Sequence, residues 1–183
     1  MKLFDFFGSK DFDETAQKVY AVIVNQARQP EFYLNCGVPD SPDGRFDMIM
    51  VHAFLVLRRL KNDQDKSADL AQAIFDLMFA DIDQNLREMG VGDLGVGKRV
   101  KAMAEAFYGR VQAYEEGLEN NDDTLALALE RNLYRKVSPA PAQTSAMAEY
   151  IRDQAGKLEK TDFDSLTGGS LSFGPPPRLE GTS

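Results

Sequence analysis

The sequence has few of the side chains from which metal centres and nucleophilic catalytic sites are usually built. Only one cysteine, Cys36, and one histidine, His52, occur among its 183 residues. Structural zinc sites need about four ligands, mostly Cys and His, and di-iron bundles need two Glu-x-x-His pairs. A single cysteine forms no intrachain disulfide, which fits a reducing compartment. We therefore expect no metal and no other cofactor, and we expect His52 to be a hydrogen-bonded core residue rather than a base.

An excess of basic residues is also missing. The chain carries 21 Lys and Arg against 29 Asp and Glu, which gives a formal net charge of −8. Nucleic-acid-binding proteins neutralise phosphates with a basic surface, so this balance argues against DNA as a partner.

Long apolar runs are absent as well. The longest run, residues 48–57, is interrupted by His52 and is far shorter than the roughly 20 residues of a membrane-spanning helix. The first residues, MKLFDFFGSKDFDE, contain neither the apolar centre of a signal peptide nor the Arg-rich, acid-poor composition of a mitochondrial presequence. We expect a cytoplasmic protein that associates at most peripherally with the cytoplasmic face of the inner membrane.

Strand patterns are absent, whereas apolar residues recur at spacings of three and four along most of the chain. These repeats predict helices over residues 12–27, 46–61, 93–118 and 146–158. Ser67 is placed to cap a further helix that ends near Met89, and Asn121 or Asp122 to cap another that ends near Lys136. The sequence therefore predicts an all-α, single-domain bundle of about six helices.

The composition changes near the C-terminal end. Residues 168–183, GGSLSFGPPPRLEGTS, combine Gly and Ser with three successive prolines. This composition is typical of mobile chain without regular structure. We predict a helical domain over residues 1–167 and a disordered tail over residues 168–183.

Two nucleotide-binding signatures overlap in the segment EMGVGDLGVGKRVKAM, residues 88–103. The spacing G-x-G-x-x-G begins at Gly90, and the spacing G-x-x-x-x-G-K ends at Lys98. Both signatures require a strand before the glycines, and the second also requires Ser or Thr after the lysine. Here a predicted helix precedes the glycines and Arg99 follows Lys98, so nucleotide binding is disfavoured.

A structural role explains these glycines better. Gly90 falls where a left-handed residue ends a helix, and Val91 can then contact Leu86 in a Schellman motif. Asp93 or Gly95 begins the next helix, where an aspartate also meets the positive end of the helix dipole. We predict a tight corner between two helices.

The segment around this corner resembles a known family. Residues 78–118, MFADIDQNLREMGVGDLGVGKRVKAMAEAFYGRVQAYEEGL, are similar to the signature of the ubiquinol–cytochrome c chaperone family. The resemblance is carried by Asp81 and Asp83 and by the motifs Leu-Arg-Glu, Val-Gly-Asp, Val-Gly-Lys-Arg-Val-Lys and Phe-Tyr-Gly-Arg. It covers about residues 15–133.

The resemblance implies a non-catalytic, all-helical chaperone for assembly of the cytochrome bc1 complex, ubiquinol–cytochrome c reductase. Its client would be immature cytochrome b or another bc1 subunit, and the mitochondrial relatives imply a second small chaperone and a ribosome contact as further partners. Two alternatives stay open. One is an interaction module of the same fold that serves a different client, and the other is a helical bundle that binds a small ligand through His52, Cys36 and acidic residues.

The corner also carries a local excess of positive charge, because residues 87–110 hold five basic and three acidic side chains. Tyr and Arg are favoured anchors of protein interfaces. We predict a protein-binding groove between the two helices, bordered by Lys98, Lys101 and Tyr108. The alternative is a solvated face with internal ion pairs such as Asp83–Arg87. The candidate protein-binding residues are Arg87, Asp93, Lys98, Arg99, Lys101, Tyr108 and Arg110.

Three further features have alternative interpretations. Asp81 and Asp83 point in different directions on a helix, which disfavours a shared metal ion and favours an ion pair across the corner. The aromatic residues Phe4, Phe6 and Phe7 either pack on the bundle or contact a partner or a membrane. Several methionines either fill the core or line a groove for apolar client segments. These methionines are Met48, Met50, Met78, Met89 and Met103.

Overall fold

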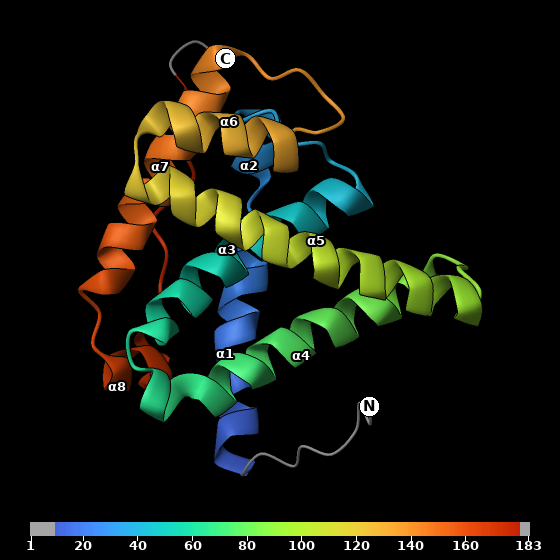
Figure 1. Cartoon of the computed structure of the whole chain (residues 1–183), viewed down its shortest axis with the longest axis vertical. Helices are drawn as coiled ribbons and strands as arrows, with labels where there is room; N and C mark the ends of the chain where they lie inside the picture. The colour runs from blue at the N-terminus through green and yellow to red at the C-terminus, as the bar shows by residue number, and fades with distance from the viewer. Residues whose placement is uncertain (1–9, 180–183) are drawn as a thin grey trace.

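Helices make up the regular structure of the chain (Figure 1). The computed structural model describes residues 10–179, and no strand occurs within them. The all-α prediction is confirmed. No helix in this range is long and apolar enough to cross a lipid bilayer. The elements are α1 (Lys10–Ala27), α2 (Pro30–Leu34), α3 (Pro42–Lys61), α4 (Gln64–Glu88), α5 (Asp93–Glu119), α6 (Asp122–Asn132), α7 (Pro141–Glu159), α8 (Phe163–Ser165) and a π-helical turn over Leu166–Ser170.

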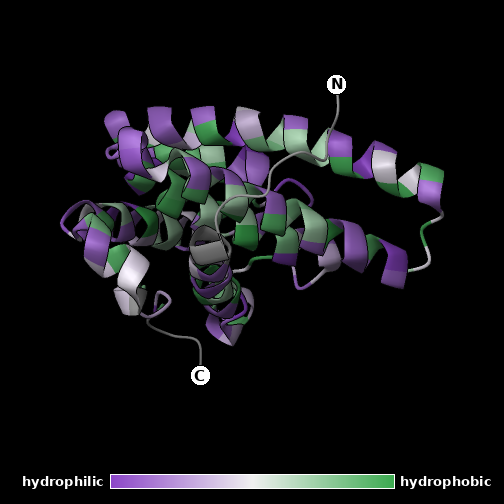
Figure 2. Ribbon diagram, turned by 90° about the horizontal axis from the view of Figure 1, so that it is seen from below, coloured by the Kyte–Doolittle hydropathy of each residue, from purple (hydrophilic) through white to green (hydrophobic). Residues whose placement is uncertain are grey.

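α3 forms the centre of the bundle. Residues 46–56 are all buried, whichever face of the helix they occupy, because α1, α4 and α7 pack around it. The helix begins at Pro42, and the Ser41 hydroxyl caps it by accepting a hydrogen bond from the Gly44 amide at 3.2 Å. Hydrophilic and hydrophobic residues alternate along the surrounding helices in Figure 2, the amphipathic pattern of helices that cover a core.

α4 and α5 form a long hairpin. They are joined at Gly90, lie close together near this joint and diverge from it, and α3 lies between their far ends in Figure 1. α6 runs back along α5, and α7 packs on both α6 and α3. The hairpin therefore projects from the body at its glycine corner and is held by the body at its open end.

Several helix boundaries differ from those predicted, and α3 begins at Pro42, four residues before the predicted start. Ser67 caps no helix, because α4 already begins at Gln64 and buries Ser67, whose hydroxyl donates to the Leu60 carbonyl at 2.6 Å. α6 ends at Asn132 and not near Lys136, although Asn121 caps its start as expected. α7 begins at Pro141, before the predicted residue 146, and its buried side chains make it a full member of the core.

Residues 168–179, called the C-terminal strap below, differ from the expected mobile tail. Leu171 is buried, and the Phe173 ring meets the His52 ring edge-on with centroids 4.9 Å apart. The Gly174 amide donates to Gln154 Oε1 at 2.7 Å, and its carbonyl accepts from Gln26 Nε2 at 2.8 Å. These contacts fix the strap against α1, α3 and α7, so the predicted disorder from residue 168 is wrong for this part of the chain.

Candidate functional site

The corner between α4 and α5 is a Schellman motif, as predicted. Gly90 has a φ of 82°, a left-handed conformation that favours glycine. Its amide donates to the Arg87 carbonyl at 2.9 Å, and the Val91 amide donates to the Leu86 carbonyl at 3.1 Å. A helix leads into the glycines, so the strand that a phosphate-binding loop requires is not there.

Ion pairs brace this corner. Arg87 Nε donates to Asp83 Oδ2 at 2.6 Å within α4, and Arg87 Nη1 pairs with Asp93 at the start of α5. Asp81 has a different partner, since it accepts from the Tyr20 hydroxyl of α1 at 2.8 Å. Burial and the neighbouring Asp81 raise the pKa of Tyr20, so its hydroxyl stays protonated and donates. Residues 10–179 hold no cluster of side chains suited to a metal ion.

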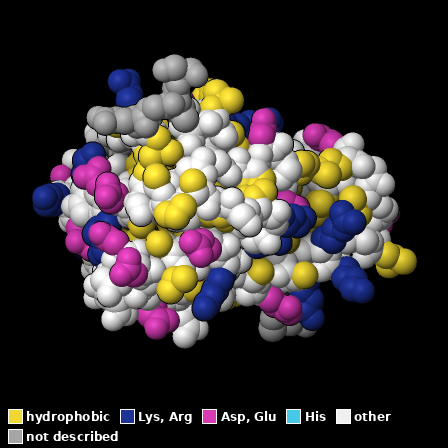
Figure 3. Space-filling model, turned by 90° about the horizontal axis from the view of Figure 1, so that it is seen from above, with side chains coloured by type: hydrophobic (Ala, Val, Ile, Leu, Met, Phe, Trp, Pro, Cys, Tyr) yellow, Lys and Arg dark blue, Asp and Glu magenta, His cyan; other side chains and the backbone are white. Residues whose placement is uncertain are grey.

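Lys98, Arg99 and Lys101 are exposed on the first turns of α5. Lys101 Nζ lies 3.9 Å from Glu105 Oε1, a weak surface pair. Figure 3 shows dark blue Lys and Arg side chains at both ends of the molecule, whereas magenta Asp and Glu side chains are more numerous at the end away from the hairpin corner. Tyr108, two turns further along α5, is 63% exposed.

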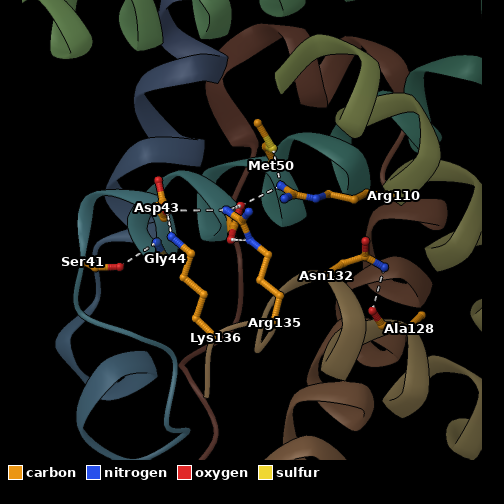
Figure 4. Close-up of polar contacts among 10 residues, drawn as sticks. Ser41, Asp43, Gly44, Met50, Arg110, Ala128, Asn132, Arg135 and Lys136 are labelled. Atoms are coloured by element: carbon orange, nitrogen blue, oxygen red, sulfur yellow. Dashed lines mark hydrogen bonds and ion pairs between the residues drawn. The ribbon is translucent and has the colours of Figure 1, made fainter. Parts of the chain in front are cut away.

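Arg110 does not belong to the exposed surface where it was predicted. Its side chain is only 9% exposed, and its Nη1 donates to Asp47 Oδ1 of α3 at 2.6 Å (Figure 4). Arg135 Nε donates to the other oxygen, Asp47 Oδ2, at 3.1 Å. Burial raises the pKa of the Asp47 carboxyl, and the two guanidinium groups oppose this shift. Arg110 therefore joins α5 to α3 inside the bundle, because an arginine pointing inward needs a buried counter-charge.

The sequence contains a signal for this ion pair that is separate from its apolar periodicity. Asp47 interrupts an otherwise apolar run between Phe46 and Met48, on a helix expected to be buried on all faces. A carboxylate at such a position predicts a buried cationic partner. Its partners, Arg110 and Arg135, lie on distant segments, so the sequence alone does not identify them.

A groove opens between the diverging ends of α4 and α5, with α3 as its floor. Its volume is about 760 Å³. Phe75 of α4 and Tyr108 of α5 face each other with ring centroids 5.8 Å apart, and Phe107 lies 5.9 Å from Phe75. Exposed Gln72 and Glu116 at its edge leave it open to solvent. Its apolar lining includes Phe54, Leu57, Ala71, Phe75, Phe107 and Val111.

The position of this groove corrects the prediction in part. It lies between the two helices, but at their open end and not beside the glycine corner, so Lys98 and Lys101 do not line it and Tyr108 does. Its rim is charged by Arg58, which pairs with Glu115 at 3.1 Å, and by the exposed Glu119.

The methionines do not line this groove. Met48, Met50 and Met78 are buried in the core, Met103 is packed against it, and Met89 is 53% exposed at the corner. Phe4, Phe6 and Phe7 lie outside the described residues.

His52 and Cys36 lie in the core and away from the groove. The His52 Nδ1 bonds to the Met48 carbonyl and its Nε2 to the Tyr150 hydroxyl, each at 2.9 Å, as expected of a core histidine. Burial lowers the pKa of His52 to about 4. Burial also raises the pKa of the Cys36 thiol to about 11, which keeps it protonated and unreactive at neutral pH. Neither side chain is placed to act on a ligand in the groove.

An all-helical body with an apolar groove open to solvent is suited to binding another polypeptide. The chain belongs to the ubiquinol–cytochrome c chaperone family, whose sequence profile matches residues 34–173. The match covers the hairpin, all residues of the groove and the start of the C-terminal strap.

Individual relatives agree with this assignment. The ubiquinol–cytochrome c reductase complex assembly factor 1 of Xenopus laevis is 28% identical over 151 residues, which are 82% of this chain and 76% of that protein. The Homo sapiens protein of the same name is 29% identical over 161 residues, or 87% of this chain and 54% of that protein. The chain thus spans about half the length of the human relative.

A solved structure shows the same fold. The Cbp3 homolog from Brucella abortus is 40% identical, has a TM-score of 0.81, and matches 90% of this chain and 91% of its own. The relatives are assembly factors, and the chain accordingly belongs to a family of non-catalytic chaperones.

Proposed function

We propose that this chain is an assembly chaperone for ubiquinol–cytochrome c reductase and that its client is immature cytochrome b. Membership of the chaperone family carries the first part, since the relatives in Xenopus laevis and Homo sapiens are named as assembly factors of that complex. The second part is supported by the groove, which suits an apolar helix of a membrane subunit before its partners arrive.

The groove combines the features of helix-in-groove recognition. Two helices form its walls, aromatic rings from both walls meet across it, and Phe54 and Leu57 of α3 form the apolar part of its floor. The small side chains Ala68 and Ala71 leave space along the α4 wall. An apolar client helix lying here would be shielded from water on one side, while the charged rim stays solvated.

The test is a pull-down of the tagged chain from the membranes and the cytosol of its native cells, with cytochrome b as the readout. We expect Tyr108→Glu to reduce recovery at least about tenfold, because a carboxylate in an apolar interface costs more than about 1.4 kcal/mol. Leu127→Glu on α6 is the matched control, since Leu127 is 52% exposed and lies outside the groove.

The two parts of the proposal fail separately. If cytochrome b is not recovered with the unmodified chain, the client is wrong and the alternative of an interaction module with another client gains support. If Tyr108→Glu recovers cytochrome b as well as Leu127→Glu does, the client stands and the groove is not its binding site.

We further propose that the chain works in the cytoplasm, peripherally at the cytoplasmic face of the inner membrane, where a membrane client is inserted. A second small chaperone and a ribosome contact stay predictions from the family resemblance.

A further inference from the structure

The hairpin tip, residues 87–101, exposes apolar side chains on a convex surface. Leu94 is 95% exposed and Met89 is 53% exposed, the first at the start of α5 and the second at the end of α4. A Cβ at Gly90, Gly92 or Gly97 would meet nothing within 4 Å apart from chain neighbours or the backbone of its own helix, so the backbone of the tip is uncovered on these sides. Leu94 and Met89 protrude from the tip and do not fill a pocket of the protein itself.

The same tip is cationic, although the protein is anionic. Residues 87–101 hold four basic and two acidic side chains, whereas the whole chain has a net charge of −8. Asp93 and Asp83 both pair with Arg87, and Glu88 accepts a hydrogen bond from the neutral Gln84 amide and keeps its charge, so the excess positive charge of the tip comes from Lys98, Arg99 and Lys101. Lys98, Arg99 and Lys101 are all exposed within two turns of Leu94. Lys101 pairs weakly with Glu105 at 3.9 Å, and Arg99 interacts with Asp43 of α3, whose closer partners are Lys136 and Arg135.

This combination fits an anionic lipid surface better than a folded protein. At protein interfaces, anchor side chains are buried in pockets of the partner. A side chain that protrudes this far would need a partner with a pocket of matching shape. A bilayer interface accepts an apolar point of any shape, and anionic headgroups attract Lys and Arg beside it. The negative charge of the remaining protein is repelled from such a surface, so the molecule would approach with its tip first.

We propose that the hairpin tip is a membrane contact, in which Leu94 and Met89 enter the headgroup region of an anionic bilayer while Lys98, Arg99 and Lys101 lie over the lipid phosphates. This inference rests on the peripheral location proposed above and goes further by naming the residues and the lipid chemistry. It assigns a role to the basic residues of the corner that the groove does not use.

The test is flotation of the purified full chain with vesicles of phosphatidylcholine alone or mixed with phosphatidylglycerol. We expect binding only to the mixed vesicles, and we expect it to weaken as salt rises. Replacing Lys98, Arg99 and Lys101 together by alanine should weaken binding about 100-fold, since each basic residue near an anionic surface contributes about fivefold. Leu94→Ser should weaken it about tenfold.

Matched controls remove the same chemistry elsewhere. Lys18, Lys66 and Lys160, all exposed and outside the tip, are replaced together by alanine, and Leu34→Ser replaces a leucine that is 77% exposed on α2. Both controls should bind the mixed vesicles as the unmodified chain does. Failure of the unmodified chain to bind, or equal loss in tip and control variants, would overturn the inference.

The assay contains no client, so its failure is distinguishable from failure of the proposed function. If cytochrome b is recovered in the pull-down but the chain binds no vesicles, only the membrane contact is wrong. If the tip variants lose cytochrome b while the unmodified chain binds no vesicles, the tip is a protein contact and this inference is replaced.

Discussion

His52 shows how a single buried polar residue is made compatible with an apolar core. A carbonyl only accepts hydrogen bonds, so the ring donates from Nδ1 to Met48 and its Nε2 accepts from the Tyr150 hydroxyl. Gln26 donates in turn to the Tyr150 oxygen at 2.9 Å and to the Gly174 carbonyl. This chain of bonds requires the neutral ring, and it connects α3, α7, α1 and the C-terminal strap.

The stability of the fold should therefore depend on pH through His52. Its pKa falls from 6.5 to about 4 on folding, so the unfolded chain binds more protons between these values and stability is lost as the pH falls through this window. From about pH 7.5 to about pH 5 the free energy of unfolding should decrease by about 2 kcal/mol because of this residue. Urea unfolding of the unmodified chain and of His52→Phe at both pH values measures the difference.

At neutral pH the variant should be less stable than the unmodified chain, since it leaves Tyr150 without its acceptor. The informative quantity is the change in unfolding free energy between the two pH values, compared between the two chains. The contributions of the carboxylates are common to both chains and cancel in this comparison. Equal pH dependence in the two chains would contradict this assignment of the His52 pKa.

Arg110 is the residue at which a structural role should be separable from a binding role. Arg110→Met removes one partner of the buried Asp47 carboxylate and should destabilise the fold by about 3 kcal/mol in urea unfolding. Lys98→Met removes an equally basic but exposed side chain from the same helix, so its effect should stay within about 0.5 kcal/mol. If the two variants were equally stable, the buried position of Arg110 beside Asp47 would be contradicted.

At the scale of elements, the α4–α5 corner depends on one glycine of several. Gly90 alone among the corner glycines has a positive φ. Gly92 and Gly97 have open space where a Cβ would lie, whereas a Cβ at Gly95 would meet the Val91 side chain at 3.0 Å. The corner is closed by backbone hydrogen bonds and by the Arg87–Asp93 pair across it. Its geometry is thus set locally.

Two alanine substitutions should therefore have opposite effects. Gly90→Ala places a Cβ in the left-handed region and should cost about 1 kcal/mol of unfolding free energy. Gly97→Ala lies inside α5 with nothing near the new methyl group, so it should stabilise the fold by up to about 1 kcal/mol. Thermal unfolding of both variants tests this, and two changes of the same sign would count against the Schellman geometry.

The elements also show which predictions the sequence supports. The helices and the Schellman corner were predictable because apolar spacing and a glycine at a helix end act over a few residues. The groove was misplaced because its position depends on how α4 and α5 diverge around α3, which no local pattern encodes. The C-terminal strap was missed because Leu171 and Phe173 have no periodicity, yet the body offers them a place to pack.

At the scale of the whole molecule, the strap joins helices that are far apart in the sequence. Leu171 and Phe173 pack on the core, and Gly174 bonds to Gln154 of α7 and Gln26 of α1. The strap is therefore packed as part of the helical body.

Truncation after Ser170 should lower the free energy of unfolding by about 3 kcal/mol, because it exposes the apolar surface that Leu171 and Phe173 cover. Truncation after Leu179 retains every described contact and serves as the control. Urea unfolding with far-ultraviolet circular dichroism compares the two chains. If both were equally stable, the strap would not contribute to the fold.

The length of α5 has a consequence for how a client would be presented. An α-helix rises about 1.5 Å per residue, so Tyr108 lies about 20 Å and Glu119 about 40 Å along the axis from the start of α5. With Leu94 anchored among lipid headgroups, this rod would act as a spacer. A hydrophobic segment carried at its far end would stay some tens of ångströms from the bilayer until release lets it insert.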